Sequence, residues 1–166
     1  NELSICLNSI EYVEEYADFI EIVISDNNPS NTFKKFKNDK FYDVIFNRNN
    51  ENLGIMGNMK KIIELSNGEF IFFITDDDYF LPGAVSSIFK YVNNIKPEIN
   101  AFKVGLITHM IKSKKVWENN YNITKSVSYE NKQKNIFESS HIFSGSCIKK
   151  EKIPFEDFDK NYNKFY

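Results

Sequence analysis

The sequence contains only two cysteines, Cys6 and Cys147, and one arginine, Arg48, beside 20 lysines. Two cysteines exclude both a disulfide framework and a four-cysteine zinc site. No apolar run approaches the roughly 20 residues that a membrane-spanning helix needs. The 21 basic residues are balanced by 23 acidic ones, and the resulting net charge of -2 argues against a nucleic-acid partner, because proteins that bind nucleic acid carry a basic face.

Several catalytic motifs are also missing. The chain has no G-x-S-x-G, no GxGxxG and no P-loop pattern, which weakens hydrolase, dehydrogenase and NTPase interpretations. What is present fits a folded domain: 166 residues, 42% of them hydrophobic, suit a single domain with its own core. Asparagine occurs 22 times, which indicates AT-rich codon usage, so one asparagine alone is weak support for a site. The chain begins at Asn1 without a methionine, and we expect a fragment of a longer protein.

Strand and helix patterns alternate along the first ninety residues. Short apolar runs predict strands at residues 21–25, 44–46 and 69–75. Apolar residues at helical spacing predict helices at residues 3–13, 55–65 and 84–92. Asn67 and Gly68 predict the end of the second of these helices. Residues 101–111 and 142–149 are strand-like, whereas residues 112–140 show no clear pattern. The alternation predicts an α/β fold with a mostly parallel sheet flanked by helices.

Three polar loops follow the predicted strands, at residues 26–31, 48–57 and 76–78. Ligands bind beyond the carboxyl ends of parallel strands, so we expect these loops to line one edge of the sheet. The third loop is an aspartate triplet, Asp76, Asp77 and Asp78, whose carboxylates repel one another unless a cation or hydrogen-bond donors neutralise them. Mg²⁺ and Mn²⁺ prefer such oxygen ligands. The alternative is a solvated acidic turn in which Asp76 or Asp78 caps the next helix.

The other two loops allow two interpretations each. Asp26 either makes an Asx-turn with Asn28 or Ser30, or accepts hydrogen bonds from a nucleotide base or ribose. Asn52, Gly54 and Asn58 provide either loop and helix-cap chemistry or a close backbone approach to a ligand.

Three segments of the chain form a recognisable set. They are EIVISDNNPS (residues 21–30), NLG followed by Asn58 (residues 52–58) and NGEFIFFITDDDYFLPGA (residues 67–84). In order and spacing they resemble glycosyltransferase family 2, which has the GT-A fold. The resemblance implies an inverting transfer of a sugar from a nucleotide-sugar donor, with a D-x-D motif that holds Mn²⁺ or Mg²⁺. The family's first strand, with its Pro-x-Tyr-Asn-like loop, has no counterpart here.

The resemblance also implies roles for individual residues. Asp26 matches the acidic residue that contacts the uracil or ribose of the donor. The aspartate triplet matches the metal motif in two ways: Asp76 and Asp78 form the D-x-D pair, or, aligned on Pro82, Thr75 takes the first position and Asp77 is the ligand. We favour Asp77 as the direct ligand, with Asp76 toward the ribose and Asp78 in support. The expected donor-binding residues are Asp26, Asn28, Asn52, Gly54, Asn58 and Asp76, and the expected metal ligands are Asp77, Asp78 and Asp76.

A catalytic base is expected well after the metal motif, where it would deprotonate the acceptor hydroxyl. Asp157, Glu156 and Asp159 are the candidates, and an acidic surface loop is the alternative. Within one GT-A domain spanning residues 1–166, we expect a donor half at residues 1–95 and the start of an acceptor half at residues 96–166.

The sequence therefore predicts a bacterial-type glycosyltransferase of surface glycan biosynthesis that uses an NDP-sugar, with a UDP-sugar favoured. The expected acceptor is a glycan or a lipid-linked sugar, and the expected location is the cytoplasm, including peripheral association with the inner face of the cytoplasmic membrane. Three rivals stay open: a metal-dependent nucleotidyltransferase, a non-catalytic binding module with the same fold, and a plain structural domain.

Overall fold

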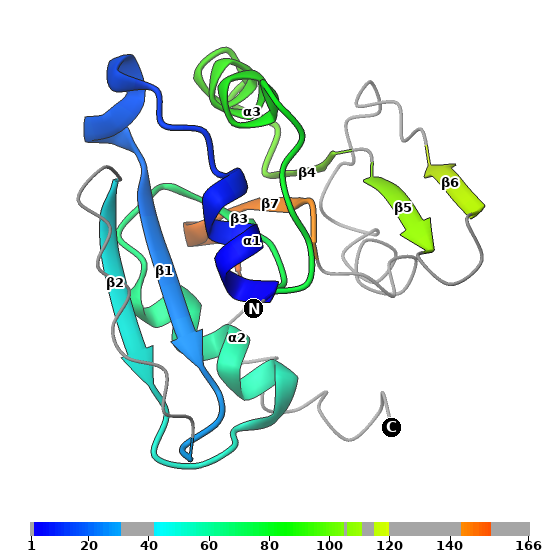
Figure 1. Ribbon diagram of the computed structural model, residues 1–166. Coiled ribbons are helices and arrows are strands. Elements are labelled where there is room, and N and C mark those ends of the chain that lie inside the picture. The colour runs from blue at the N-terminus through cyan, green and yellow to red at the C-terminus, as the bar shows by residue number, and fades with distance from the viewer. Residues whose placement is uncertain (1, 31–41, 105, 111–114, 120–143, 154–166) are drawn as a thin grey trace. The chain divides into compact units, whose positions relative to one another are not determined.

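The computed structural model of the chain describes residues 2–30, 42–104, 106–110, 115–119 and 144–153 (Figure 1). The chain divides into two compact units, and each is described by itself. The first unit consists of residues 1–11 and 72–149, and the second consists of residues 12–71 and 150–166.

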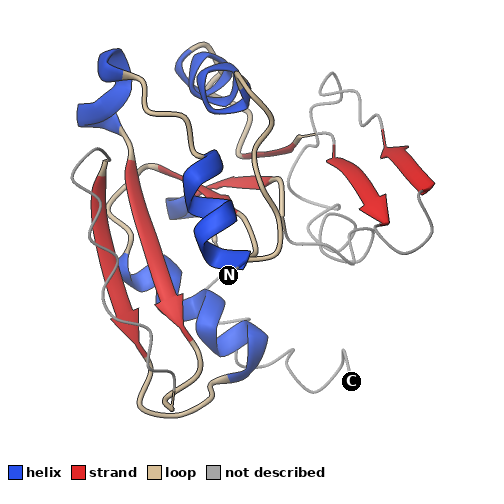
Figure 2. Cartoon of the chain, in the orientation of Figure 1, coloured by secondary structure: helices blue, strands red, loops and turns tan. Residues whose placement is uncertain are grey.

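The second unit contains a parallel pair of strands, β1 (Glu21–Asp26) and β2 (Asp43–Arg48). Both strands are apolar in the middle and become polar where they end, at Asp26 and Arg48, which face each other in the register. Helix α2 (Gly54–Leu65) packs against β1, as Figures 1 and 2 show. Parallel strands run in the same direction, so the polar ends of β1 and β2 lie at the same edge.

Helix α2 ends where predicted, but for a different reason. The helix ends at Leu65, as expected, but Ser66 then has an extended backbone with φ -71° and ψ 142°. Asn67 and Gly68 therefore do not supply a left-handed cap. Instead, their backbone N–H groups donate to the Glu21 carboxylate, at N···O distances of 2.5 and 3.0 Å. The start of β1 thus holds the segment that follows α2.

The rest of the second unit is built from short elements. The 3-10 helix η1 (Glu14–Phe19) precedes β1, and η2 (Lys150–Lys152) closes the described part of the unit. The Tyr42 hydroxyl accepts a hydrogen bond from the Val13 N–H at 3.0 Å. This bond joins the residue just before η1 to the residue just before β2. Among the described residues of this unit, the buried apolar side chains are Tyr16, Tyr42, Met59, Ile63, Ile71 and Ile153.

The first unit contains helices α1 (Glu2–Ser9) and α3 (Ala84–Asn93) and two small sheets. In one sheet the strand order is β3-β7-β4, for β3 (Phe70–Phe73), β7 (Ser146–Lys149) and β4 (Ala101–Lys103). The boundary between the units falls within β3, after Ile71. The other sheet pairs β5 (Leu106–Met110) with β6 (Lys115–Asn119). Where the structure describes this unit, its buried apolar side chains are Cys6, Leu7, Ile10, Phe73, Val85, Phe102, Cys147 and Ile148.

The α/β class is confirmed, and the described strands show how the sheets are paired. The β1–β2 pair is parallel, whereas β4–β7 and β5–β6 are antiparallel. Residues 101–111, expected as one strand, contain two, β4 and β5, because the chain leaves the first sheet after Lys103. β6 lies within residues 112–140, for which no element is predicted. Among the described residues, no helix combines the length and apolar character that crossing a membrane requires.

Candidate functional site

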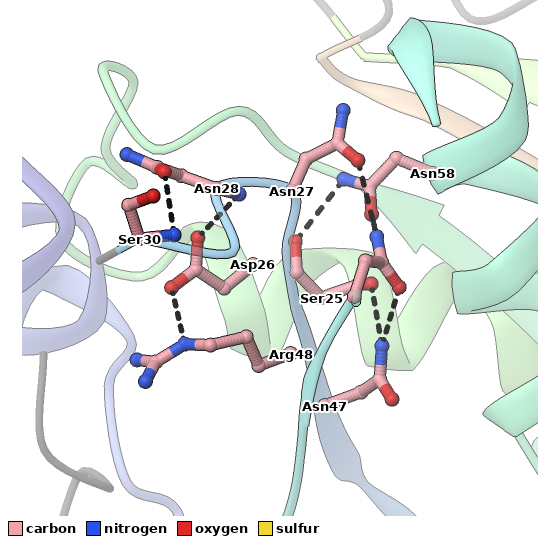
Figure 3. Close-up of polar contacts among 9 residues, drawn as sticks. Ser25, Asp26, Asn27, Asn28, Ser30, Asn47, Arg48 and Asn58 are labelled. Atoms are coloured by element: carbon pink, nitrogen blue, oxygen red, sulfur yellow. Dashed lines mark hydrogen bonds and ion pairs between the residues drawn. The ribbon is translucent and has the colours of Figure 1, made fainter. Parts of the chain in front are cut away.

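Asp26 begins a pair of side-chain turns at the end of β1. Its Oδ1 accepts a hydrogen bond from the Asn28 N–H at 3.0 Å, and Asn28 Oδ1 accepts one from the Ser30 N–H, also at 3.0 Å (Figure 3). These are successive Asx-turns, in which a short polar side chain replaces a backbone acceptor. The turn expected for Asp26 is therefore present, and it fixes the direction in which the chain leaves the strand.

Arg48 holds the second oxygen of the same carboxylate. Its Nε lies 3.2 Å from Asp26 Oδ2, and the two side chains are 31% and 14% exposed, respectively (Figure 3). The Arg48 guanidinium also lies over the Phe46 ring, 5.6 Å from its centre, in a cation–π contact. A carboxylate offers about four acceptor positions, so Asp26 keeps capacity for further hydrogen bonds after these two contacts.

Beside this pair, an asparagine network joins the ends of both strands to the start of α2. We define it as Asn27, Asn47, Asn49, Asn52 and Asn58. Asn27 donates to Asn52 Oδ1 at 2.8 Å and to the Gly54 carbonyl at 3.2 Å. The side-chain oxygen of Asn27, Oδ1, accepts hydrogen bonds from the Leu53 N–H at 2.9 Å and from Asn49 Nδ2 at 3.1 Å. The loop after β2 is thus fastened to the loop after β1.

Asn49 is the centre of the network and is only 6% exposed. Its Nδ2 also donates to Asn58 Oδ1 at 2.8 Å, and its Oδ1 accepts from Asn47 Nδ2 at 2.8 Å. Asn58, in α2, donates to the Ser25 carbonyl at 3.1 Å, as Figure 3 shows. A buried amide needs such partners, because leaving its donors and acceptor unpaired costs about 1–3 kcal/mol. The network therefore fixes β1, β2 and α2 as one scaffold for Asp26.

The structure thus brings together the donor-binding residues predicted on the first two loops. Asn52 and Asn58 belong to the asparagine network, and Asn28 belongs to the turn of Asp26. Gly54 has φ 67°, a left-handed conformation that favours glycine at the start of α2. Asn52 Oδ1 accepts a hydrogen bond from the Gly54 N–H at 2.9 Å, so loop chemistry is present there. Among the described residues no side chain caps α2, and the Asn58 side chain bonds to the end of β1 instead.

Sequence reasoning missed Asn27, Asn49 and Arg48 as members of this site. Arg48 carries a signal that could have found it, since it is the only arginine of the chain and stands at a strand end. The two asparagines carry none, because nothing in the sequence separates them from the other twenty.

A pocket of about 480 Å³ lies beside the network, between the loop after β2 and α2. Its basic groups, Arg48, Lys60 and Lys61, are accompanied by the acidic Glu51 and Glu64. Lys61 forms an ion pair with Glu64, with an N···O distance of 3.9 Å. The pocket therefore carries charges of both signs, close to balance.

The aspartate triplet lies in the first unit, directly after the strand β3. The Asp78 N–H donates to the Thr75 carbonyl at 3.2 Å, and the Thr75 hydroxyl donates to Asp78 Oδ2 at 2.8 Å. Asp76 and Asp77 are exposed, and within the described residues no hydrogen bond or ion pair reaches their carboxylates. The residue at the start of α3 is Gly83, with φ 79°, and no side chain in the described part of the chain caps that helix. Asp76 and Asp78 therefore do not act as its cap.

The residues that follow the triplet contact α1, within the same unit. The Phe80 N–H donates to Ser9 Oγ at 2.8 Å, and the Phe80 ring lies 5.5 Å from that of Phe72. Burial raises the pKa of the Cys6 thiol to about 11, and the carboxylates of Asp76, Asp78 and Asp77 add to this effect. Three negative charges thus face a buried, uncharged thiol.

The donor atoms of the triplet fit a divalent cation that shares its coordination with a ligand. Within the described residues, no three His, Cys, Asp or Glu side chains are arranged to hold a metal by themselves. Mg²⁺ and similar cations, however, are commonly bound by one or two carboxylates together with water and substrate phosphates. Asp76 and Asp77 provide two such carboxylates. The predicted bases Glu156, Asp157 and Asp159 lie outside the described residues.

Comparison with known families identifies the class of protein. The family described as Glycosyl transferase family 2 matches residues 1–151. The chain therefore belongs to glycosyltransferase family 2, whose members bind a nucleotide-sugar donor and an acceptor. Neither the curated proteins nor the solved structures give a significant match.

Proposed function

We propose that the chain is the donor-binding part of an inverting glycosyltransferase that uses a UDP-sugar and Mn²⁺ or Mg²⁺. Membership of family 2 supports glycosyl transfer in general. The observation that carries the finer proposal is the state of the aspartate triplet: Asp78 is held by Thr75, whereas the carboxylates of Asp76 and Asp77 are exposed at the end of a strand.

Asp77 would hold the cation, with Asp76 toward the ribose and Asp78 in support. When bound, a divalent cation neutralises the charge that builds on the departing diphosphate. The carboxylates must therefore be accessible to the cation, and Asp76 and Asp77 are exposed. An acceptor hydroxyl would attack from the opposite side and invert the anomeric centre, after a carboxylate base, Glu156, Asp157 or Asp159, removes its proton.

Asp26 would recognise the nucleoside. Uracil presents one N–H donor between two carbonyl acceptors, and a carboxylate beside a guanidinium offers the complementary groups. Asp26 and Arg48 form such a pair, and both are partly accessible. This chemistry favours a uracil base over cytosine, which has no ring N–H at that position.

Titration calorimetry with UDP tests the proposal, first with Mn²⁺ and then with EDTA. We expect binding only with Mn²⁺, and at least a tenfold loss of affinity in Asp77→Asn, because a neutral amide is a poorer ligand. Asp43→Asn is the matched control, since Asp43 is exposed and lies at the opposite end of β2 from Arg48. The control should bind as the unchanged chain does.

The outcomes separate the alternatives. Equal binding with EDTA, or unchanged binding in Asp77→Asn, would refute the metal role of the triplet. Binding of UDP without transfer or hydrolysis of any UDP-sugar would favour the non-catalytic module. For the acceptor we propose a growing surface glycan or a lipid-linked sugar, which would place the reaction in the cytoplasm, at the inner face of the membrane.

A further inference from the structure

Ser144 and Gly145 form the turn that leads into β7, and Ser144 contacts the loop that carries the aspartate triplet. The Thr75 N–H donates to Ser144 Oγ at 2.9 Å, and the hydroxyl oxygens of the two residues lie 3.0 Å apart. Ser144 is only 1% exposed, whereas Thr75 is exposed. A buried hydroxyl therefore supports Thr75, the residue immediately before the triplet.

The contacts have a definite direction. The Thr75 hydroxyl has one proton and donates it to Asp78 Oδ2. In the contact between the two hydroxyls, Ser144 must therefore be the donor. The result is a chain of hydrogen bonds, from Ser144 to Thr75 to Asp78, that ends on one oxygen of a carboxylate. Hydrogen bonds in such a chain polarise and strengthen one another.

The backbone around Ser144 keeps it in place. The Gly145 N–H donates to the Phe73 carbonyl at 2.9 Å, and the Gly145 carbonyl accepts from the Val104 N–H at 2.9 Å. These bonds attach the residue after Ser144 to the ends of β3 and β4 at once. Ser144 is thus fixed by two strands, whereas Asp76 and Asp77 of the loop that it contacts are exposed.

We propose that Ser144 is a positioning residue for the metal and donor site: through Thr75 it fixes the Asp78 carboxylate and the shape of the aspartate triplet. This inference rests on the proposed function of the triplet. Ser144 itself would touch neither the cation nor the donor. Its effect would be to hold the carboxylates in a binding arrangement before the ligand arrives, so that less ordering is needed on binding.

The experiment measures Mn²⁺ affinity, with and without UDP, from the electron paramagnetic resonance signal of free Mn²⁺. Ser144→Ala removes both contacts to Thr75, and we expect it to weaken Mn²⁺ binding in the presence of UDP by about tenfold, a loss of the order of a hydrogen bond's net contribution. Thr75→Val has the same shape as threonine but no hydroxyl, and it should weaken binding equally. Thr75→Ser restores the hydroxyl and should restore binding.

Ser146→Ala is the matched control. Ser146 is also a buried serine, 5% exposed, and within the described residues its hydroxyl makes no hydrogen bond to the loop of the triplet. This change should lower the melting temperature without altering Mn²⁺ affinity. If Ser144→Ala behaves in the same way, with lower stability and unchanged affinity, Ser144 has only a structural role and the proposal is wrong.

A double variant tests the route through Thr75. Residues that act in one chain are not additive, so Ser144→Ala combined with Thr75→Val should bind no more weakly than either alone. Additive losses would overturn the proposal. Should Ser144→Ala fail to fold, the exposed Thr75→Val and Thr75→Ser pair decides. If the unchanged chain binds no Mn²⁺ with UDP, the proposed function itself fails, and the role of Ser144 fails with it.

Discussion

Replacement of Asn49 by alanine is the sharpest test of the scaffold that holds Asp26. The change removes three side-chain hydrogen bonds, to Asn27, Asn58 and Asn47, from a residue that is 6% exposed. Each is worth about 1 kcal/mol net, which sets a starting figure of about 3 kcal/mol.

The partners decide how much of that figure is realised. Asn27 Oδ1 keeps the Leu53 N–H, and Asn47 Nδ2 keeps Ser25 Oγ at 3.2 Å. Only Asn58 Oδ1 loses the hydrogen bond that it has within the described residues. We therefore expect the free energy of unfolding to fall by about 2–3 kcal/mol, a large part of the roughly 5–15 kcal/mol of a typical domain.

Urea unfolding followed by circular dichroism measures this loss. A fall of 2–3 kcal/mol should lower the midpoint by about 1–2 M urea for a domain of this size. Asn50→Ala is the matched control, because Asn50 is the exposed neighbour and undergoes the same chemical change. A loss below about 0.5 kcal/mol, or one no larger than that of Asn50→Ala, would refute the reasoning, since surface changes remain within that range.

Two further predictions concern Glu21 and Gly83. Burial opposes ionisation of Glu21, but hydrogen bonds from Asn67 and Gly68 outweigh it and lower the pKa of the carboxyl. The stability that Glu21 contributes is therefore present above its unfolded pKa of about 4.3 and is lost as the pH falls through the folded pKa. In Glu21→Gln, the urea midpoint should therefore fall less steeply as the pH is lowered into the acid range. Gly83 has φ +79°, and none of the described residues has an atom within 4 Å of an added Cβ. Gly83→Ala should therefore cost about 1 kcal/mol through backbone strain alone, and Gly83→Asn less, in the same urea assay.

Each of these predictions has a clear contrary result. An acid dependence of the midpoint that is identical in Glu21→Gln and the unchanged chain would show that another group titrates. A Gly83→Ala variant as stable as the unchanged chain would show that α3 can begin with an ordinary backbone conformation.

The elements that were predicted well are those whose signal is local. The apolar run of residues 21–25 and the helical spacing of residues 55–65 correspond to β1 and α2 because burial on one face imposes a period on neighbouring residues. The end of α2 was placed correctly but for the wrong reason. A glycine after a helix indicates a left-handed cap, and only the fold reveals that Glu21, 46 residues earlier than Asn67, provides the acceptor instead.

The site was predicted in part for the same reason. Asp26 and the aspartate triplet stand out because carboxylates directly follow apolar strands. Asn49 does not stand out, because its importance comes from burial and from partners at the ends of other elements. Ser144 is beyond the reach of sequence reasoning altogether, since its partner Thr75 is 69 residues away.

That separation of 69 residues affects the order in which parts of the protein fold. During synthesis, all three aspartates leave the ribosome long before Ser144 does, so the acidic loop exists for a time without its buried support. Long-range contacts also form late in refolding, because closing a long loop costs entropy before the contact repays it. The loop of the aspartate triplet is therefore among the last parts of the first unit to acquire its final shape, and it does so only when β7 docks beside β3.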